Sequence, residues 1–451
     1  MPLDRREFFQ TSLGTLAATV LPGALHAGAV SATKETLSVG VIGSGLRGQS
    51  HIGELLGQPG VSVTAIADID PEMVRRTKEI FTKAGLSQPT VYDQGPTDYK
   101  RLLAESGVDA VIIATPWQWH TVMAVDAMHA GKYTGLEVGG AFSIDECWEL
   151  VRAHEQSGTH LFFLENVCYR RDVMAVLNMV RQGLFGELLH LEGGYQHDLR
   201  AVKFNDGKSA YGNGVEFGEK AFHEARWRTR HSQYRNGDLY PTHGLGPVAN
   251  MIDINRGNRL VGLTSMATKS RGLHKYVVEQ GGADHPNAKV EFALGDIVTT
   301  MISTQNGETV VLHHDTNSPR PYSLGFRVQG TQGLWMDVND SLHLEGTSPA
   351  HQWEPAAKYL ERYDHPYWKK DGEIAAGAGH GGMDYFLIKD FVRVAKANSR
   401  PPIDVYDGAT WLAVTPLSEQ SVATGGTLQL FPDFTRGRWM ERPADFATAE
   451  W

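Results

Sequence analysis

Cysteine is scarce in this sequence. Only Cys147 and Cys168 occur among 451 residues, and their separation is not that of a metal site. We therefore expect neither a disulfide framework nor a structural metal centre, and no metal site is predicted elsewhere. Both cysteines are predicted to be small, buried, apolar side chains.

A block of basic residues is also missing. The formal net charge is −10, and the charges are spread along the chain. Such a surface does not favour nucleic acid or an anionic membrane as partners. With 41% hydrophobic and 21% charged residues, the composition is that of a globular protein. The length predicts about two or three domains.

The apolar run at 13–25 is too short to span a bilayer. Near the N-terminus, the segment 4–9 (DRREFF) places two arginines before a modest apolar run at 13–25, and AGA at 27–29 offers a cleavage site. This order predicts a twin-arginine signal peptide over 1–29, with an amphipathic N-terminal helix as the alternative. The mature protein would be periplasmic or secreted, and exported already folded.

The first half of the chain alternates between strand and helix patterns, which predicts a doubly wound parallel sheet over 36–165. The predicted strands cover 37–42, 61–67, a segment from 91, 109–114, 133–138 and 160–164. The predicted helices cover 49–58, 75–84, 121–130 and 145–156.

After residue 166 the pattern changes to β-type runs with few helices between them, which predicts an α+β domain over 166–440. Its open sheet would be mostly antiparallel. The loop 203–235 is long for a compact domain, and we expect it to be functional. The predicted helices are 171–182, 383–397 and 407–423, the last two packing back toward the first domain, and the predicted strands are 187–195, 260–268, 288–292, 297–304, 308–314 and 325–329.

A glycine-rich turn follows the first predicted strand. Gly43, Gly45 and Gly48 have the G-x-G-x-x-G spacing, which lets a backbone approach a pyrophosphate at a helix N-terminus. Asp68 lies 20 positions after Gly48, at the end of the second strand. There its carboxylate would bind the adenosine ribose and repel a 2′-phosphate, which favours NAD over NADP. The alternative is a glycine turn that binds nothing.

Two further turns fall at the carboxyl edge of the predicted sheet, where the nicotinamide half would lie. One is TPWQWH at 115–120, whose Trp117, Trp119 and His120 would wall the cofactor or, alternatively, cap a domain interface. The other is LEVGG at 136–140. Glu137 is followed there by a valine and two glycines, none of which can give or take a proton.

The motifs GVIGSGLRG, IADID, IIATPWQWH, GKYTGLEVGG and ENVCYRR resemble sugar oxidoreductases related to glucose–fructose oxidoreductase and inositol 2-dehydrogenase. That family reads Glu-Lys-Pro where this chain has Glu137-Val138-Gly139, and the lysine is absent here. The motifs TPWQWH, LEVGG, GGYQHDLR and YPTHGLGP are similar to those of glycoside hydrolase family 109, the NAD-dependent α-N-acetylgalactosaminidases. The second resemblance covers essentially the whole mature chain.

Family 109 membership would imply a bound NAD and a glycan or glycoside substrate. It would also imply two sets of contacts. The NAD contacts would come from Leu46, Arg47, Asp68, Trp117, Gln118, Trp119, His120, Glu137, Val138 and Asn166, and the sugar contacts from Tyr195, Arg228, Tyr240, Pro241, Thr242, His243 and Tyr322.

The resemblance further implies glycosidic cleavage through oxidation at sugar C3, elimination across C2 and C1, addition of water, and reduction. By this reading His243 serves the C3 hydroxyl and Tyr195 is the C2 base, while Tyr240 and Tyr322 position the ring and Arg228 binds polar groups. A carboxylate pair drawn from Glu165, Glu192 and Asp198 is an alternative route. A sugar–sugar oxidoreductase, a hexosaminidase of other anomeric or sugar preference, and a non-catalytic sugar-binding protein also stay open, as does the oligomeric state.

Overall fold

The computed structural model describes residues 33–448. The predicted export signal at 1–29 lies outside these residues. Within 33–448, every helix is too short or too polar to cross a bilayer.

The first sheet is parallel throughout and follows the strand order β3-β2-β1-β4-β5-β6. The central strand β1 lies between β2 and β4, with Val39 opposite Val63 on one side and Ala110 on the other. Its residues are almost wholly buried because helices cover both faces. The strands are β1 (Leu37–Ile42), β2 (Val61–Ala67), β3 (Thr90–Tyr92), β4 (Ala110–Ile113), β5 (Tyr133–Leu136) and β6 (Leu161–Phe163).

Two helices of this part begin at recognisable N-terminal sequence signals. Helix α1 starts directly at the glycine turn, and α5 starts at a capping box in which Ser143 and Glu146 satisfy each other's backbone N–H groups. The helices are α1 (Leu46–Leu56), α2 (Pro71–Lys83), α3 (Tyr99–Ala104), α4 (His120–His129) and α5 (Ile144–Ser157), with the 3-10 turn η1 (Trp117–Trp119) before α4.

The second sheet has the order β14-β13-β12-β11-β7-β10-β9-β8-β15. All its pairs are antiparallel except β10 with β7, which places His314 beside Tyr195. The strands are β7 (Leu188–Gln196), β8 (Leu260–Ala267), β9 (Ile297–Thr304), β10 (Thr309–Asp315), β11 (Arg327–Gly330), β12 (Gly333–Met336), β13 (Ser341–Leu344), β14 (Glu354–Pro355) and β15 (Gln429–Leu430).

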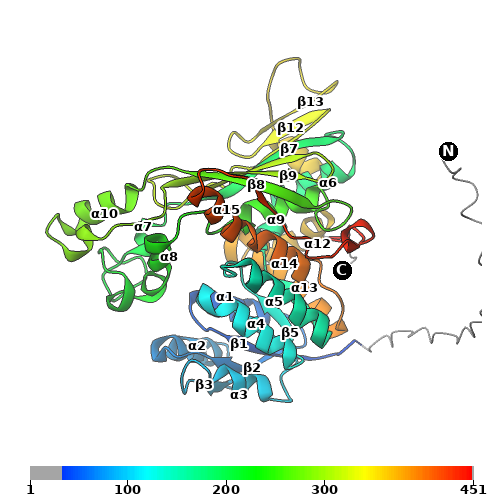
Figure 1. Cartoon of the computed structure of the whole chain (residues 1–451). Coiled ribbons are helices and arrows are strands. Elements are labelled where there is room, and N and C mark those ends of the chain that lie inside the picture. The colour runs from blue at the N-terminus through cyan, green and yellow to red at the C-terminus, as the bar shows by residue number, and fades with distance from the viewer. Residues whose placement is uncertain (1–32, 449–451) are drawn as a thin grey trace, which may run out of the picture. The chain divides into compact units, whose positions relative to one another are not determined.

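Helices from the second half of the sequence pack on both sheets. Helix α9 packs on β7 and α14, α13 packs on α1, and α14 packs on α5 and β6. Figure 1 shows α9, α13 and α14 between strands β1–β5 and strands β7–β9. These helices are α6 (Arg171–Arg181), α7 (Arg200–Lys203), α8 (Arg228–Tyr234), α9 (Thr242–Met251), α10 (Gly272–Gly281), α11 (Ala357–Arg362), α12 (Pro366–Ala375), α13 (Met383–Ala397), α14 (Val405–Leu412) and α15 (Val414–Ala423).

The predicted fold class is confirmed: a Rossmann-like parallel sheet joined to an α+β part with a mostly antiparallel sheet. Cys147 and Cys168 are both free and buried, as expected.

Two predicted elements were wrong. The predicted strand 288–292 is the end of a 3-10 turn and coil, because its Phe292 packs locally on Leu273 and Val277 of α10 instead of joining a sheet. The predicted single helix 407–423 is two helices, α14 and α15. Pro416 has no N–H to donate to the Leu412 carbonyl, so the helix is interrupted between α14 and α15.

Candidate active site

The glycine turn after β1 needs glycine for steric reasons. Gly43 has φ +87°, and a Cβ there would lie 2.8 Å from the Ala114 carbonyl carbon. A Cβ on Gly48 would lie 2.0 Å from the Gly43 carbonyl oxygen. The N-terminus of α1 therefore presents bare backbone, which is the form of a pyrophosphate cradle.

Asp68 lies beside this turn, at the end of β2. Its Oδ2 accepts the Ser44 N–H at 2.6 Å and its Oδ1 accepts the Asp70 N–H at 2.9 Å. Burial raises the pKa of Asp68, while these hydrogen bonds act in the opposite direction. The carboxylate is fixed where an adenosine ribose would lie, so the residues present fit a dinucleotide.

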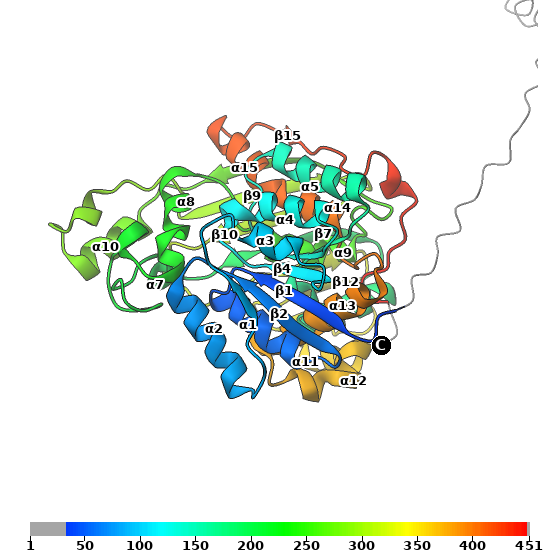
Figure 2. The same cartoon turned by 90° about the horizontal axis from the view of Figure 1, so that it is seen from below.

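A segment of the second part lies over the same turn. We call residues 204–235 the strap; it includes α8. The Leu46 N–H donates to His223 Nε2 at 3.0 Å, and Arg226 reaches Asp70 at 3.4 Å. In both Figure 1 and Figure 2 the green segment that includes α8 lies on the same side of the molecule as α2. The functional role expected for the loop 203–235 is consistent with this contact, whereas His223 itself was not predicted.

Glu137 lies in a buried charge network. Its Oε1 accepts from Arg47 Nε and is 2.6 Å from His51 Nε2, and Arg47 also pairs with Asp384 of α13 at 2.6 Å. Burial alone would raise the pKa of Glu137, but Arg47 and the His51 hydrogen bond hold it well below its usual range. Asn166 donates to Asp384 at 2.8 Å. The network thus joins three of the predicted cofactor residues.

Asp384 was missed by the sequence reasoning, because nothing local in GGMDYF distinguishes it from a surface helix residue. Desolvation opposes its charge, but His380 and Arg47 keep its pKa far below the ordinary value.

The turn at Val138–Gly140 is shaped by the neighbouring turn that holds Trp117. Gly139 has φ +83°, and a Cβ there would lie 2.4 Å from Trp117 Nε1. The Val138 N–H donates back to Glu137 at 3.0 Å. A Lys-Pro pair would not fit this backbone, because proline requires φ near −65°. The backbone conformation and the packing of Trp117 therefore exclude the proline of the Glu-Lys-Pro motif at position 139.

The side chains of the 117–120 turn differ in solvent exposure. Gln118 is exposed and Trp119 is half-buried. His120 is buried, with its ring nitrogens 3.0 and 2.8 Å from the Gly139 and Thr115 carbonyl oxygens. Its ring holds the two turns together, so a cofactor contact from His120 would have to come from its backbone.

Three tyrosines and a histidine from the predicted sugar set lie together. The ring of Tyr195 is 4.5 Å from Tyr240, 5.3 Å from His243 and 6.3 Å from Tyr322, measured between centroids. Helix α9 brings His243 to β7 because glycines meet there: a Cβ on Gly244 would lie 2.2 Å from the Gly194 nitrogen. The sequence carried this signal in GGYQ and THGLG, although α9 itself was not predicted.

His243 is held by a carboxylate. Its Nδ1 lies 2.7 Å from Glu165 Oε1, which also accepts the Val167 N–H at 3.0 Å. Glu165 is fully buried. The carboxylate fixes the tautomer with a proton on Nδ1, which leaves the His243 Nε2 lone pair to accept a proton.

Arg228 of the strap links the two halves of the site. Its guanidinium lies 4.9 Å from the Trp117 ring centroid and 5.4 Å from that of Tyr240, and it pairs with Glu224 at 2.6 Å. Burial raises the pKa of Tyr195, and the nearby Arg228 lowers it. Pro241 and Thr242 are buried at the start of α9. Thr242 Oγ1 has no hydrogen-bond partner among residues 33–448.

A cavity of about 940 Å³ opens onto this cluster. It is large enough for a sugar and part of a leaving group. Its lining includes members of the tyrosine cluster and His380, which belongs to the charge network. The lining residues are Arg170, Arg171, Asp172, Ala175, Tyr195, His197, His243, Tyr322, Leu360, Glu361, His380, Gly381 and Met383.

The three carboxylates considered for direct displacement do not gather at the cavity. Glu192 lies on the opposite face of β7 from Tyr195 and pairs with Arg327 at 3.1 Å. Asp198 is held by Arg200 at 2.7 Å. Only Glu165 reaches the cluster, and it does so through His243.

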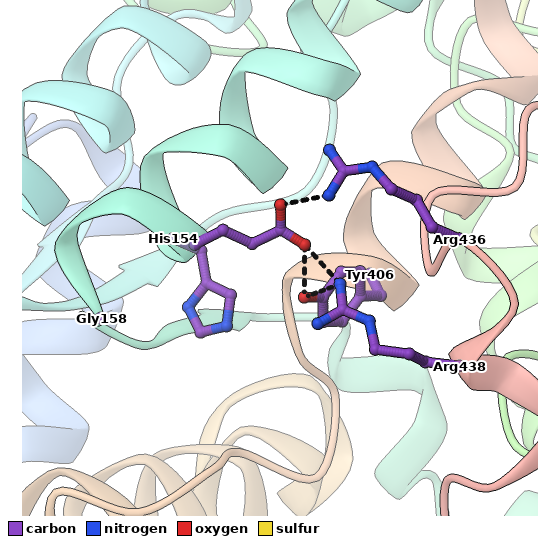
Figure 3. A pocket seen from close by; sticks show the side chains of 6 residues that line it. His154, Gly158, Tyr406, Arg436 and Arg438 are labelled. Atoms are coloured by element: carbon purple, nitrogen blue, oxygen red, sulfur yellow. Dashed lines mark hydrogen bonds and ion pairs between the residues drawn. The ribbon is translucent and has the colours of Figure 1, made fainter. Parts of the chain in front are cut away.

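A second, more open pocket of about 460 Å³ lies by the end of α5 (Figure 3). There Glu155 accepts hydrogen bonds from Arg436 at 2.6 Å and from Tyr406 at 3.0 Å, and also pairs with Arg438. These pairs satisfy the charges and tie the C-terminal segment to α5. Its lining includes none of the predicted cofactor residues and none of Tyr195, Tyr240 and Tyr322.

Comparison with known proteins agrees with this geometry. A family model described as "Oxidoreductase family, NAD-binding Rossmann fold" matches residues 37–164, and one described as "Glycosyl hydrolase 109, C-terminal domain" matches residues 169–441. A "Glycosyl hydrolase family 109 protein" from Stenotrophomonas maltophilia (strain K279a) is 52% identical over 99% of this chain and 98% of its own. An "Alpha-N-acetylgalactosaminidase" from Tannerella forsythia is 52% identical over 91% of this chain and 89% of its own.

Solved structures show the same fold at low identity. A levoglucosan dehydrogenase in complex with NADH and L-sorbose has a TM-score of 0.63 at 20% identity, covering 88% of this chain and 99% of its own. An inositol dehydrogenase homologue from Azotobacter vinelandii, complexed with NADH and myo-inositol, has a TM-score of 0.63 at 18% identity, covering 88% and 98%. With its NAD-binding Rossmann domain and its family-specific second domain, the chain belongs to glycoside hydrolase family 109 and is a glycoside hydrolase that uses NAD.

Proposed function

We propose that the protein releases terminal N-acetylgalactosamine, preferably α-linked, by a redox cycle on its bound NAD. The observation that carries this proposal is the proximity of two proton-transfer groups, Tyr195 and His243, at a cavity that also touches the network around Glu137. The name of the Tannerella forsythia relative supports the choice of sugar and anomer.

The chemistry divides among few residues. When bound, NAD supplies the hydride acceptor and later the hydride donor for sugar C3. His243, with its Nδ1 proton directed at Glu165, uses Nε2 to take the C3 hydroxyl proton. Tyr195 then removes the C2 proton, which the C3 ketone has made acidic, and the C1 substituent leaves. Water adds at C1 while a proton returns to C2, and reduction at C3 completes the cycle.

The remaining residues orient the sugar. Tyr240 and Tyr322 both lie next to the Tyr195 ring, and Arg228 offers a guanidinium to polar groups of the substrate. No side chain at 138–140 can exchange a proton, so acid–base chemistry is left to residues of the second part.

One assay separates the candidate activities. The purified protein, with no added NAD, is incubated in deuterated water with aryl α- and β-N-acetylhexosaminides and with free sugars. Aglycone release with deuterium gained at C2 supports the proposal. Oxidised and reduced free sugars in equal amounts would indicate a sugar–sugar oxidoreductase, and sugar binding without any product would indicate a binding protein. Release without C2 labelling would contradict the redox route.

We also propose that the protein acts in the periplasm or outside the cell. The two arginines, apolar run and AGA site of 1–29 support export through the twin-arginine pathway. Replacing both arginines of this segment by lysine should leave the full-length protein in the cytoplasm, as measured by cell fractionation. Unchanged export of that variant would contradict the assignment.

A further inference from the structure

His197 is a residue of the cavity that belongs to the GGYQHDLR motif and has no role in the proposed function. It lies two positions after Tyr195, where β7 has just ended, and its backbone N–H donates to the Asp315 carbonyl at 2.8 Å. That bond keeps the chain extended, so the two side chains project to the same side. The Tyr195 hydroxyl lies 3.2 Å from His197 Nδ1.

The Tyr195 hydroxyl is close enough to donate a hydrogen bond to His197 Nδ1, and the two rings are in contact. They meet edge to face, with centroids 5.8 Å apart and planes at 86°. His197 also touches Tyr322, at 4.9 Å between centroids, and all three residues line the cavity. A substrate at the cluster would therefore have the Tyr195–His197 hydrogen bond directly beside it.

We propose that Tyr195 and His197 act as a proton-transfer pair, in which His197 Nδ1 takes the Tyr195 hydroxyl proton as the resulting phenolate removes the proton from sugar C2. This rests on the proposed function, and it identifies what makes Tyr195 basic. His197 acts through Tyr195 and is a positioning residue with respect to the sugar.

The electrostatic environment suits this division of roles. Burial raises the pKa of Tyr195, so the phenol does not ionise unaided near neutral pH. Burial and the Arg228 charge lower the pKa of His197, so its ring is neutral there and Nδ1 can accept a proton. Arg228 also stabilises the phenolate that forms. The charged and titratable groups facing His197 are Arg228, Asp198, His243, Glu224, Tyr195 and Tyr322.

The step balances without any group beyond those named. The C2–H bond breaks, its proton passes to the Tyr195 oxygen, and the proton that oxygen held passes to His197. The C2 electron pair forms the C1–C2 double bond as the C1–O bond breaks, and the leaving oxygen takes the imidazolium proton, directly or relayed through one water. His197 is then neutral again, and the reverse transfers serve the addition of water.

The test compares His197→Asn with His197→Ala and the wild type. An asparagine amide oxygen can still accept the Tyr195 hydrogen bond but does not take up a proton. We expect His197→Asn to lower both aglycone release and deuterium uptake at C2 by about 10²-fold. The rate of oxidation at C3 should change less than about threefold, since His243 and Glu165 are untouched. This rate is measured from the near-ultraviolet absorbance of the reduced cofactor after an aryl N-acetylgalactosaminide is added.

His190→Asn is the matched control, because His190 lies on the same strand but bonds to Thr309 and Glu192 on the opposite face. It should behave as the wild type. Wild-type C2 exchange in His197→Asn would overturn the proposal, because Tyr195 would then need no proton acceptor at position 197. An equal loss of C3 oxidation and C2 exchange would overturn it as well.

The two proposals fail differently. Wild-type protein that exchanges C2 of free N-acetylgalactosamine yet releases no aglycone would refute the proposed hydrolysis and leave the pair intact. Wild-type protein that does neither would overturn both.

Discussion

Replacing Glu165 by glutamine tests the role of the buried carboxylate beneath His243. The substitution keeps the side-chain shape and an oxygen that can accept from His243 Nδ1 and from the Val167 N–H. It removes only the negative charge that stabilises a protonated His243. A charge-assisted hydrogen bond is stronger than a neutral one by about 1–2 kcal/mol, which corresponds to about 5- to 30-fold in rate.

The expected result is a kcat reduced by about 5- to 30-fold on an aryl α-N-acetylgalactosaminide, with KM changed less than about twofold. Because the lost charge acts on the C3 hydroxyl proton, deuterium at sugar C3 should slow the variant more than the wild type. Glu192→Gln is the control, since Glu192 lies on the far face of β7 and pairs with Arg327. If folded Glu165→Gln kept wild-type kcat and showed no larger isotope effect, the assignment of His243 and Glu165 would be wrong.

Three further changes test other parts of the site. Gly139→Ala should destabilise the fold by about 1–3 kcal/mol in denaturant unfolding, because φ is +83° and the new methyl overlaps Trp117; an unchanged midpoint would contradict this. Arg47→Met should cost about 3–5 kcal/mol at pH 7, since it strands two buried carboxylates. The pKa values of those carboxylates are depressed, so the pairing stabilises fully above about pH 4, and the cost should shrink as the pH falls below that value. Burial raises the pKa of Asp238 to about 7. Keeping Asp238 neutral therefore stabilises the folded protein fully below about pH 4, and this contribution is lost as the pH rises through 7. Asp238→Asn should raise the thermal midpoint at pH 8 much more than at pH 5, because the amide stays neutral at both pH values.

Much of the architecture follows from local pattern. Alternating apolar runs and helix signals were sufficient for the parallel sheet and for strands such as Ile297–Thr304, because these segments bury side chains with a strict period. The strand predicted at 288–292 failed because an apolar pattern does not specify the partner against which it packs. Helix α9 was missed because its glycines and proline read as a loop, although the glycines are what let it approach β7.

The candidate site was predictable only where a short sequence motif indicates the chemistry. The spacing of Gly43, Gly48 and Asp68 is sufficient to predict a dinucleotide-binding site. His223 and Asp384 cannot be found this way, because their partners Leu46 and Arg47 lie far away in the chain and only the folded structure brings them together.

The strap has a consequence for how the enzyme acquires its cofactor. A pyrophosphate that binds the Leu46 N–H must take that hydrogen bond from His223, while Arg226 still links the strap to Asp70 and Arg76 lies 5.6 Å from the Phe222 ring centroid. The strap therefore ties the nucleotide-binding turn to a distant part of the chain through contacts on both sides of α2's first residues and at α1. A molecule built in this way would load its cofactor once, while the polypeptide is folding, and afterwards treat it as a fixed component rather than a consumable.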